Sequence, residues 1–458
     1  MEVFTWRSAM PASAAEVFAW HARPGAFERL MPPWQRHRIV ERTGTGILDG
    51  ARSVFELAFG PIRVRWVALH SGYQEGRQFR DEQIQGPFEV WLHTHRFLPE
   101  NDETSWLEDH VAYELPFSPL SHVMAGRLLG NMLEQVFRFR HERIRNDLER
   151  HRRYSANGPQ TIALSGASGL VGRRLSTFLS TGGHAVRRLV RPPARPGPQD
   201  IRWNPNAGEL DAWALEGLDA VVHLAGENVA EGRWTKARKA DLRASRIEST
   251  RLLSQALAGL RRKPRVLICA SAVGIYGDRG ETPLDERSAP GEGFLAELCQ
   301  AWEAAADPAR QAGIRVVHLR LGTVLAREGG ALGKLALPFS LGLGGRIGNG
   351  RQAISWMAAE DVVGAIYQAL FDPRLAGPVN AVAPQPVTNA QFTRVLARLM
   401  SRPALLPLPA LAVKLGLGEM GEALLLKGGR VHPARLQAVG FPYLYGNLQA
   451  ALSHELGV

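Results

Sequence analysis

The first 150 residues alternate hydrophobic and polar positions in several short segments. A period of two residues runs through 53–59, 63–68 and 88–93, with turn residues between them. Such alternation is typical of antiparallel strands that bury one face. The spacing then becomes helical between residues 126 and 151, with hydrophobic residues at Leu129, Leu133, Val136, Phe137, Ile144 and Leu148. The sequence therefore predicts a sheet on which a long helix packs.

The pattern changes after a linker over residues 151–160, which contains Asn157, Gly158 and Pro159. Apolar runs typical of buried strands follow at 161–165, 184–190, 220–224, 265–270 and 315–319. Helical stretches separate them, at 172–181, 236–258 and 293–311 among others. Strands that alternate with helices predict a doubly wound parallel sheet.

The length of 458 residues indicates more than one domain. The net charge of +11 favours anionic ligands. Because the excess Arg is dispersed, without basic blocks interleaved with aromatic residues, a phosphorylated cofactor explains the charge better than a nucleic acid.

The two cysteines, Cys269 and Cys299, lie in apolar or helical patterns, which favours neither a disulfide framework nor a thiolate metal site. No secretion signal and no membrane-spanning run stand out. We therefore expect a soluble protein of the reducing cytoplasm, with no membrane partner.

A glycine-rich loop joins the strand at 161–165 to the helix that follows. Gly166 permits a tight turn, Gly169 lets the backbone approach a pyrophosphate, and Gly172 allows close packing of helix and strand. The motif alone is weak, and the alternative is a glycine-rich turn without a ligand, but the strand–loop–helix context favours a dinucleotide. The residues expected to contact it here are Gly166, Ser168, Gly169, Leu170, Val171 and Gly172.

The strand at 184–190 is followed by Arg191 rather than by an acidic residue. An acidic side chain there would bind the ribose hydroxyl of NAD, whereas Arg can pair with the additional phosphate of NADP. The cofactor is therefore predicted to be NADP(H), unless Arg191 is only a solvated surface residue. Small residues after the strand at 220–224 are expected to pass under the cofactor, and the predicted contacts there are Leu224, Ala225 and Gly226.

Several stretches together resemble the atypical extended short-chain dehydrogenase/reductases, in particular the group of nucleoside-diphosphate-sugar epimerases with a short C-terminal domain of unknown function. They include 165–172, 223–228, 233–235, 270–277, 319–325, 354–356 and 406–409. The resemblance covers about two-thirds of the chain. It implies an NADP-binding Rossmann domain with a substrate lobe at 160–400 and a C-terminal α/β cap at 401–458.

In that superfamily a Ser and a Tyr-x-x-x-Lys helix carry the chemistry. Ser271 occupies the Ser position, but the helix within 293–303 has neither Tyr nor Lys at that spacing. The nearest hydroxyl by sequence is Tyr276, which we expect either to exchange a proton with substrate or to shape the pocket wall. Ser271 and Leu321 complete the expected cofactor contacts.

Three residues are expected to line the substrate half of the cleft: Arg320, Lys334 and Trp356. Asp361 is expected in the same part of the cleft, with a cap on the helix that begins near it as the alternative. His223 is expected to be a core or strand-end residue rather than a catalytic base.

Residues 1–153 resemble the START-like helix-grip superfamily of polyketide cyclases and carriers of hydrophobic ligands. The resemblance rests on residues 13–18, Pro32-Pro33-Trp34 and the long terminal helix. It implies a cavity for a hydrophobic small molecule, with a filled core as the alternative. His93 and His95 face the same side of a strand but have no third ligand nearby in sequence, so we predict no metal site.

Taken together, the sequence predicts an NADP(H)-dependent oxidoreductase or epimerase-like enzyme. Hydride transfer would involve a carbonyl or carbinol carbon of an unidentified small-molecule substrate near Ser271 and Tyr276. The alternative is a non-catalytic NADP(H)-binding sensor or ligand carrier, which the missing Tyr and Lys would suit. The sequence indicates neither the substrate nor the oligomeric state.

Overall fold

The computed structural model describes residues 1–60, 62–116 and 119–458. The chain divides into two compact units, the first built mainly from Met1–Pro159 and the second from the remainder apart from Thr177–His184 and Gly457. The segment 401–458, expected to be a separate C-terminal domain, belongs almost entirely to the second unit. Among the described residues, no helix combines the length and apolar character needed to cross a membrane.

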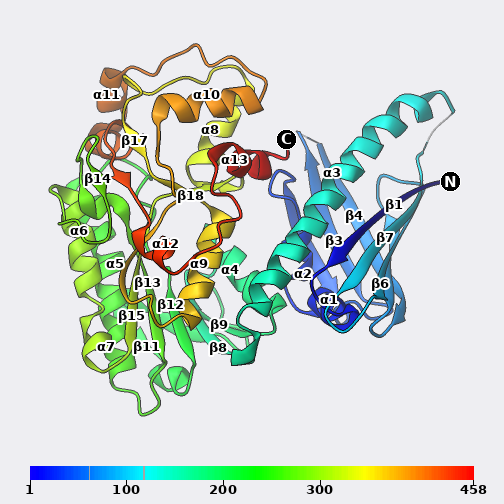
Figure 1. Ribbon diagram of the computed structural model, residues 1–458, viewed down its shortest axis with the longest axis horizontal. Helices are drawn as coiled ribbons and strands as arrows, with labels where there is room; N and C mark the ends of the chain where they lie inside the picture. The colour runs from blue at the N-terminus through cyan, green and yellow to red at the C-terminus, as the bar shows by residue number, and fades with distance from the viewer. Residues whose placement is uncertain (61, 117–118) are drawn as a thin grey trace. The chain divides into compact units, whose positions relative to one another are not determined.

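The first unit is an antiparallel sheet with helices, as the alternating pattern predicts. Seven strands pair in the order β1-β7-β6-β5-β4-β3-β2 (Figure 1). Their bounds are β1 Glu2–Met10, β2 His37–Thr43, β3 Arg52–Phe59, β4 Ile62–Gln74, β5 Gln78–Gln85, β6 Val90–Pro99 and β7 Ser105–Glu114. The helices are α1 Ala14–Ala22, α2 Ala26–Leu30 and α3 Pro119–Arg152, followed by a 3₁₀ turn at Ser155–Asn157.

The long helix α3 packs on this sheet through the residues that the helical spacing selects. Ile144 and Leu148 join a core with Phe97 and Leu107, and Phe137 packs with residues of β7 in a second cluster. The helix α1 begins where the Ser13 hydroxyl accepts a hydrogen bond from the Glu16 amide at 3.3 Å. The predicted helix on a sheet is thus confirmed.

The second unit contains an eight-stranded sheet in the order β11-β10-β9-β8-β12-β13-β15-β19. All pairs are parallel except β10–β11. The order reverses between β8 and β12, as in dinucleotide-binding Rossmann folds. The bounds are β8 Thr161–Ser165, β9 Ala185–Val190, β10 Ile201–Asn204, β11 Glu209–Leu210, β12 Ala220–His223, β13 Val266–Ala272, β15 Arg315–Leu321 and β19 Gly377–Ala381.

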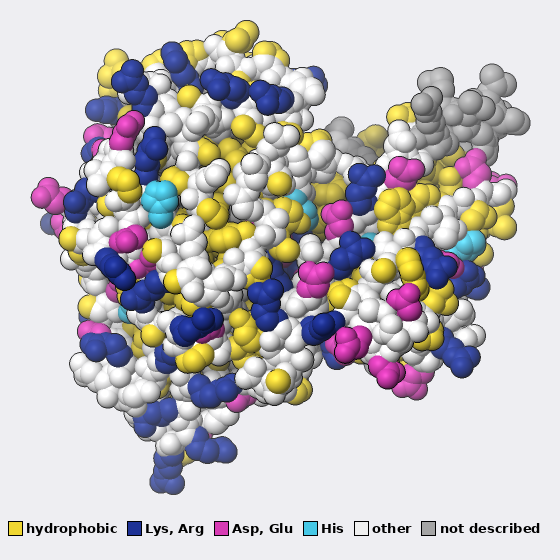
Figure 2. All heavy atoms as spheres, in the orientation of Figure 1, with side chains coloured by type: hydrophobic (Ala, Val, Ile, Leu, Met, Phe, Trp, Pro, Cys, Tyr) yellow, Lys and Arg dark blue, Asp and Glu magenta, His cyan; other side chains and the backbone are white. Residues whose placement is uncertain are grey.

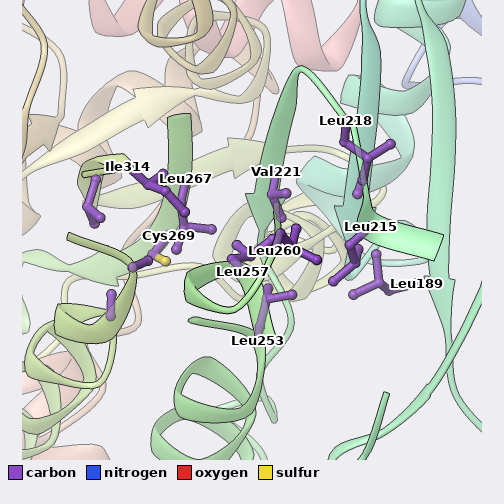
Figure 3. Packing of buried hydrophobic residues seen from close by; sticks show 14 of the residues in the cluster. Leu189, Leu215, Leu218, Val221, Leu253, Leu257, Leu260, Leu267, Cys269 and Ile314 are labelled. Carbon is purple, nitrogen blue, oxygen red and sulfur yellow. The ribbon is translucent and has the colours of Figure 1, made fainter. Parts of the chain in front are cut away.

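Successive strand residues are buried on both faces of this sheet, because helices cover both faces. One face packs on α5 (Lys236–Ala258) through Leu253 and Leu257, with Val221, Leu267 and Cys269 from the strands (Figure 3). The alternate residues, such as Ile162 and Val222, are also fully buried. The helices that flank the sheet are α4 Leu170–Thr181, α5 Lys236–Ala258, α6 Phe294–Ala304, α7 Asp307–Gln311 and α9 Ala359–Phe371. The doubly wound sheet is confirmed.

The predicted helix over 293–311 is two helices, α6 and α7. Pro308 lies in the first turn of α7, and it has no amide hydrogen to donate to the preceding turn. The break places the end of α6 beside the sheet.

The remaining elements form small sheets and helices at the carboxyl end of the strands, which agrees with a C-terminal α/β cap. The two-stranded pairs are β14–β21, β16–β18 and β17–β20. Bounds of this part are β14 Pro283–Leu284, β16 Thr323–Ala326, α8 Gly330–Ser340, β17 Ala353–Ile354, β18 Trp356–Ala358, β20 Val387–Thr388, α10 Asn389–Leu399, α11 Ala410–Gly421, β21 Arg430–Val431, α12 Ala434–Ala438 and α13 Leu448–Leu456. Short 3₁₀ turns lie at Pro205–Ala207, Ala212–Leu215 and Val273–Tyr276, and a π-helical turn at Glu422–Leu426.

On the face drawn in Figure 2, Lys and Arg side chains are spread among hydrophobic and polar ones. Their dispersal along the sequence is thus matched by dispersal over this face.

Candidate functional site

The glycine-rich loop lies between β8 and the start of α4. Gly166 has φ +70°, and a Cβ there would lie 2.8 Å from the carbonyl carbon of Leu224. A Cβ at Gly172 would lie 2.1 Å from the carbonyl oxygen of Gly166. Any side chain at either position would force the loop apart. The expected roles of these two glycines therefore have a geometric basis: one makes the turn, and the other lets the helix approach it.

The same contact brings two predicted cofactor segments together. Leu224 and Ala225 follow the end of β12, where the Ala225 amide donates to Ser165 Oγ at 3.3 Å. Gly166 packs against this backbone, whereas Ser168 and Gly169 are exposed. The first turn of α4 holds no acidic residue. Because first-turn amides have no partner within their own helix, this end of α4 suits an anionic group.

Arg191 follows β9 and its side chain is 58% exposed. Its Nη2 lies 3.5 Å from Glu227 Oε1, and Arg238 Nη1 lies 3.5 Å from Glu227 Oε2. One carboxylate is thus shared by two guanidinium groups at distances that leave both able to bind a phosphate. Arg238 was not expected from the sequence, because it lies in α5, far along the chain from the loop.

His223 is a core residue, in line with expectation. It is fully buried, Nδ1 lies 2.6 Å from Ser165 Oγ, and Nε2 lies 3.0 Å from Thr250 Oγ1. Burial lowers its pKa to about 4. A neutral imidazole with both nitrogens engaged holds β8, β12 and α5 together.

Three polar residues lie side by side at the carboxyl ends of neighbouring strands. Ser271 of β13 pairs in register with Arg320 of β15, and Arg320 pairs with Asn380 of β19. Ligands of open α/β sheets bind at this edge. The register brings Ser271 and Arg320 together, as the expectation of a shared site requires.

Glu303, at the end of α6, links these residues and was missed by the sequence analysis. Its Oε1 accepts from Ser271 Oγ at 2.7 Å and from Arg320 Nε at 2.8 Å, and its Oε2 accepts from Arg320 Nη2 at 2.8 Å. The side chains of Glu303 and Arg320 are only 13% and 8% exposed. Burial lowers the pKa of Arg320, but the bond to Glu303 outweighs it and raises that pKa well above the usual range. Glu303 belongs to no motif at this position, so nothing in the sequence marks its carboxylate as part of the site.

Tyr276 continues the chain of hydrogen bonds. It is 0% exposed, its hydroxyl donates to Asn380 Oδ1 at 2.8 Å, and it accepts from Arg320 Nη1 at 2.9 Å. Burial raises its pKa, against the effect of Arg320. The proton-exchange role of Tyr276 stays a prediction. These contacts favour the alternative, that it shapes the wall of the site. We call Ser271, Glu303, Arg320, Tyr276 and Asn380 the Ser271–Asn380 network.

The other expected substrate residues lie outside this network. Lys334 is on α8, with Nζ donating to the Ala230 carbonyl at 3.1 Å. Trp356 is 1% exposed and its indole donates to the Gln385 carbonyl at 3.1 Å, so it is a core residue in this structure. Leu321 ends β15 beside Arg320 and is partly exposed.

Asp361 is fully buried in the first turn of α9 and accepts from the amides of Leu444 and Tyr445 at 2.8 and 2.9 Å. Its contacts therefore anchor the C-terminal segment. This role differs from a substrate contact.

In the first unit His93 and His95 are not surface residues: they are 3% and 4% exposed. A third candidate ligand, Asp81, comes from the neighbouring strand β5. Asp81 is distant from His93 and His95 along the chain, so the sequence around the histidines gives no sign of it.

A sheet of this order, with a glycine loop at its reversal point and a polar edge at the carboxyl ends, defines a nucleotide-binding Rossmann domain. Three family models match: "NAD dependent epimerase/dehydratase family" at residues 162–381, a domain of unknown function at 408–455, and "polyketide cyclase / dehydrase and lipid transport" at 10–139. An epimerase family protein of Mycobacterium bovis is 44% identical over 293 residues, which are 64% of this chain and 96% of that protein. The chain belongs to this epimerase family, with a helix-grip domain before the family region.

Human epimerase family protein SDR39U1 is 37% identical over 64% of this chain and 98% of that protein. A crystal structure of that human protein (isoform 2) with NADPH has a TM-score of 0.59 and 35% identity, over 65% of this chain and 99% of that one. The crystal structure of a nucleoside-diphosphate sugar epimerase from Corynebacterium glutamicum has a TM-score of 0.80 and 32% identity, over 99% of this chain and 90% of that one. The similarity to the last structure thus extends over both units.

Proposed function

We propose that residues 160–458 bind NADP(H) and transfer hydride to or from a carbonyl or carbinol carbon. The observation that carries the proposal is the loop at β8 and α4, where Gly166 and Gly172 leave no room for side chains. This backbone suits a pyrophosphate at a helix N-terminus. The human relative whose structure was solved with NADPH supports the same cofactor here.

The choice of NADP(H) over NAD(H) rests on two guanidinium groups. Arg191 and Arg238 both lie 3.5 Å from Glu227, and a phosphate on the ribose would compete with this carboxylate for them. The shared carboxylate holds the two groups near each other before the cofactor arrives.

The Ser271–Glu303 pair suits the proton that accompanies hydride transfer. The nicotinamide ring, when bound, supplies the hydride acceptor or donor. Because Ser271 Oγ donates its hydrogen to Glu303, its lone pairs are available to accept from a carbinol hydroxyl. As Ser271 Oγ accepts the carbinol proton, its own proton moves to the Glu303 carboxylate, whose negative charge Arg320 balances until that transfer. We therefore assign the proton relay to Ser271 and Glu303, and a positioning role to Tyr276.

The experiment measures cofactor binding by calorimetry and NADPH turnover with a panel of sugar nucleotides, quinones and ketones. Gly166→Ala should weaken NADPH binding at least tenfold, which is about 1.4 kcal/mol. Gly416→Ala is the matched control, since a Cβ at Gly416 would meet nothing within 4 Å. If neither nicotinamide dinucleotide gives a binding signal with the unmodified protein, the proposal is wrong.

Ser271→Ala should abolish turnover and leave NADPH affinity within a few fold. General acid–base catalysis contributes roughly 10²–10⁴-fold, so the loss is easily measured. Ser254→Ala is the control: Ser254 is equally buried, but its hydroxyl bonds to backbone carbonyls of Arg251 and Ala305. Tight NADPH binding without turnover of any compound would favour the sensor or carrier instead.

For the first unit we propose binding of an apolar small molecule at a row of aromatic side chains. Phe55 and Trp66 have ring centroids 5.9 Å apart, Trp66 and Trp91 5.2 Å, and Trp91 and Phe88 4.7 Å. Trp66, Phe88 and Trp91 are only partly buried. The match to a lipid-transport family model supports this proposal. Saturable quenching of Trp fluorescence by aromatic or fatty-acyl compounds, lost in Trp91→Ala, would test it.

A further inference from the structure

The first unit holds a group of buried ionisable side chains that the proposed function does not use. We call it the histidine–aspartate cluster: His21, His70, Asp81, His93, His95, Asp109 and His141. Except for Asp81 and His70, these residues are at most 5% exposed. Burying so many ionisable groups is costly unless they satisfy one another or bind an ion.

The pairing of the strands places the five cluster residues that lie on strands in two rows on one face of the sheet, while His21 lies on α1 and His141 on α3. Asp81 of β5 lies opposite His93 of β6 and also opposite His70 of β4. Asp109 of β7 lies opposite His95. Because side chains two residues apart point to the same face, His93 and His95 both project between the two carboxylates.

Each imidazole therefore turns one nitrogen to Asp81 and the other to Asp109. Toward Asp81 Oδ2, the distances are 3.8 Å from His93 Nδ1 and 3.0 Å from His95 Nε2. Toward Asp109 Oδ1, they are 3.1 Å from His93 Nε2 and 2.7 Å from His95 Nδ1. Each ring thus has a carboxylate on both sides, and the two carboxylates differ in their exposure to solvent.

We propose that Asp81 Oδ2, His93 Nδ1 and His95 Nε2 bind one divalent transition-metal ion of the zinc class. Their ligand atoms all lie within 4.8 Å of one another. In a tetrahedral zinc site with bonds of about 2.0–2.1 Å, neighbouring ligand atoms are about 3.3 Å apart. The distances of 3.0 and 3.8 Å lie on either side of that value, so small movements would complete the site.

Asp109 supplies the second support that histidine ligands of metals require. Its Oδ1 accepts from His93 Nε2, which fixes the tautomer that leaves His93 Nδ1 with a free lone pair. Its Oδ2 lies 2.8 Å from His141 Nε2 on α3, which holds the carboxylate in place. A carboxylate behind a metal-bound histidine is the usual arrangement in metalloproteins.

Exposure decides on which side the ion binds. The side chain of Asp81 is 26% exposed, whereas that of Asp109 is 3% exposed. An ion can therefore reach Asp81 from solvent but not Asp109. Three protein ligands leave a fourth position, which a water molecule or an oxygen donor of a small molecule would occupy.

Two further close contacts involve the same two carboxylates. His70 Nδ1 lies 2.8 Å from Asp81 Oδ1, and His95 Nδ1 lies 2.7 Å from Asp109 Oδ1. Within the described part of the chain, neither nitrogen has a partner at the angles of a regular hydrogen bond. A cation held between the rings and Asp81 would add positive charge beside the two carboxylates of the cluster.

The experiment measures metal content of the full chain after incubation with zinc and gel filtration. We expect about one zinc per chain. X-ray absorption at the zinc edge should give nitrogen or oxygen ligands at about 2.0–2.1 Å, together with the outer-shell scattering of two imidazoles. This measurement needs no variant, so it stands even if the variants fold poorly. If protein grown without added zinc contains iron instead, the proposed site stands and its metal is iron.

Variants then locate the site. Asp81→Asn and His93→Gln should each weaken zinc binding at least tenfold in competition with a chromophoric chelator. Asp109→Asn should weaken it by about 10–100-fold, as for other residues behind a ligand. His37→Gln and Asp102→Asn, both at exposed positions, serve as controls and should leave the affinity unchanged.

Two results would overturn the proposal. One is less than a tenth of an equivalent of bound zinc, with no imidazole scattering. The other is the same affinity in the unmodified protein, Asp81→Asn and His93→Gln, which would mean that surface histidines bind the metal.

Discussion

The two units bury polar groups at the edge or face of a sheet in opposite ways. The Ser271–Asn380 network centres on an Arg–Glu pair, in which Arg320 keeps its charge at any ordinary pH. The histidine–aspartate cluster instead places titratable imidazoles between two carboxylates. The first arrangement keeps the fixed charge of Arg320 beside the proposed Ser271–Glu303 relay, and the second suits imidazoles that change their protonation or bind a metal ion.

The histidines of the cluster also differ from one another. Burial lowers the pKa of His93 to about 4 and that of His21 to about 3. Burial acts on His95 too, but Asp109 and Asp81 outweigh it and raise its pKa to about 9. The His95 ring is therefore an imidazolium at neutral pH in the metal-free protein, while those of His93 and His21 are neutral.

The largest effect on this comparison is expected from Glu303→Gln. It leaves the buried Arg320 without its carboxylate, and breaking a buried pair costs about 3–5 kcal/mol of unfolding free energy. Glu297→Gln is the control on the same helix, because Glu297 is 62% exposed and its ion pair with Arg243 contributes at most about 1 kcal/mol. Urea denaturation measures both. Equal midpoints would show that the pair does not stabilise the second unit.

Core substitutions test whether the two units unfold separately. Leu253→Ala in the second unit and Leu107→Ala in the first each remove a fully buried side chain, at about 2–5 kcal/mol. We expect each to lower a different transition in calorimetry. Leu411→Ala, at a position 67% exposed, should change neither. One common transition shifted by both variants would contradict the division.

The stabilities of the two units should also depend differently on pH. A raised folded pKa stabilises below the unfolded value of 6.5, and this stability is lost as the pH rises toward 9. With metal removed by a chelator, the first unit should therefore lose of the order of 3 kcal/mol between these values, since one pKa unit is about 1.4 kcal/mol. His93 and His21, whose pKa values are lowered, lose their contribution as the pH falls from 6.5 toward 4.

The second unit should change little between pH 6.5 and 9. Its His223 has a lowered pKa and acts only in acid, and burial raises the pKa of Cys299 to about 11, which matters only above pH 9. Thermal scans across this range give the test. A parallel decline of both units would mean that His95 is not the cause.

Helix caps give the smallest effects. Thr388 caps α10 in a full capping box with Gln391, whereas Ser13 caps α1 through one bond. Thr388→Ala and Ser13→Ala should each cost about 1 kcal/mol, and the former should cost more. Thr388→Ser keeps the hydroxyl and should retain most of the stability that Thr388→Ala loses.

The glycine loop and the parallel sheet were predictable because their information is local. Gly166, Gly169 and Gly172 lie within seven residues, and the strands around them are apolar on both faces. Strands β5 and β7 carry Asp81 and Asp109 at inward positions, which disrupts the alternation that marks a strand. These two carboxylates of the cluster therefore make β5 and β7 harder to predict from the sequence.

Sites that join distant segments were not predictable. Glu303 meets Ser271 and Arg320 only because α6 ends beside the sheet, and no spacing in the sequence encodes that contact. The same holds for Asp81 and His93, whose pairing depends on the register of β5 and β6. A search over paired strands, rather than over neighbouring residues, would have found the third ligand.

The guanidinium of Arg174 on α4 meets three carboxylates from widely separated parts of the chain. Nη1 lies 2.8 Å from Glu455 Oε1 and 3.2 Å from Glu360 Oε1, and Nη2 lies 2.6 Å from Glu328 Oε2. Glu455 is only three residues from the end of the chain. Loss of Glu455 would therefore remove one of the three carboxylates that hold α4 near the end that faces the phosphate loop, so a purification tag should not replace the residues around Glu455.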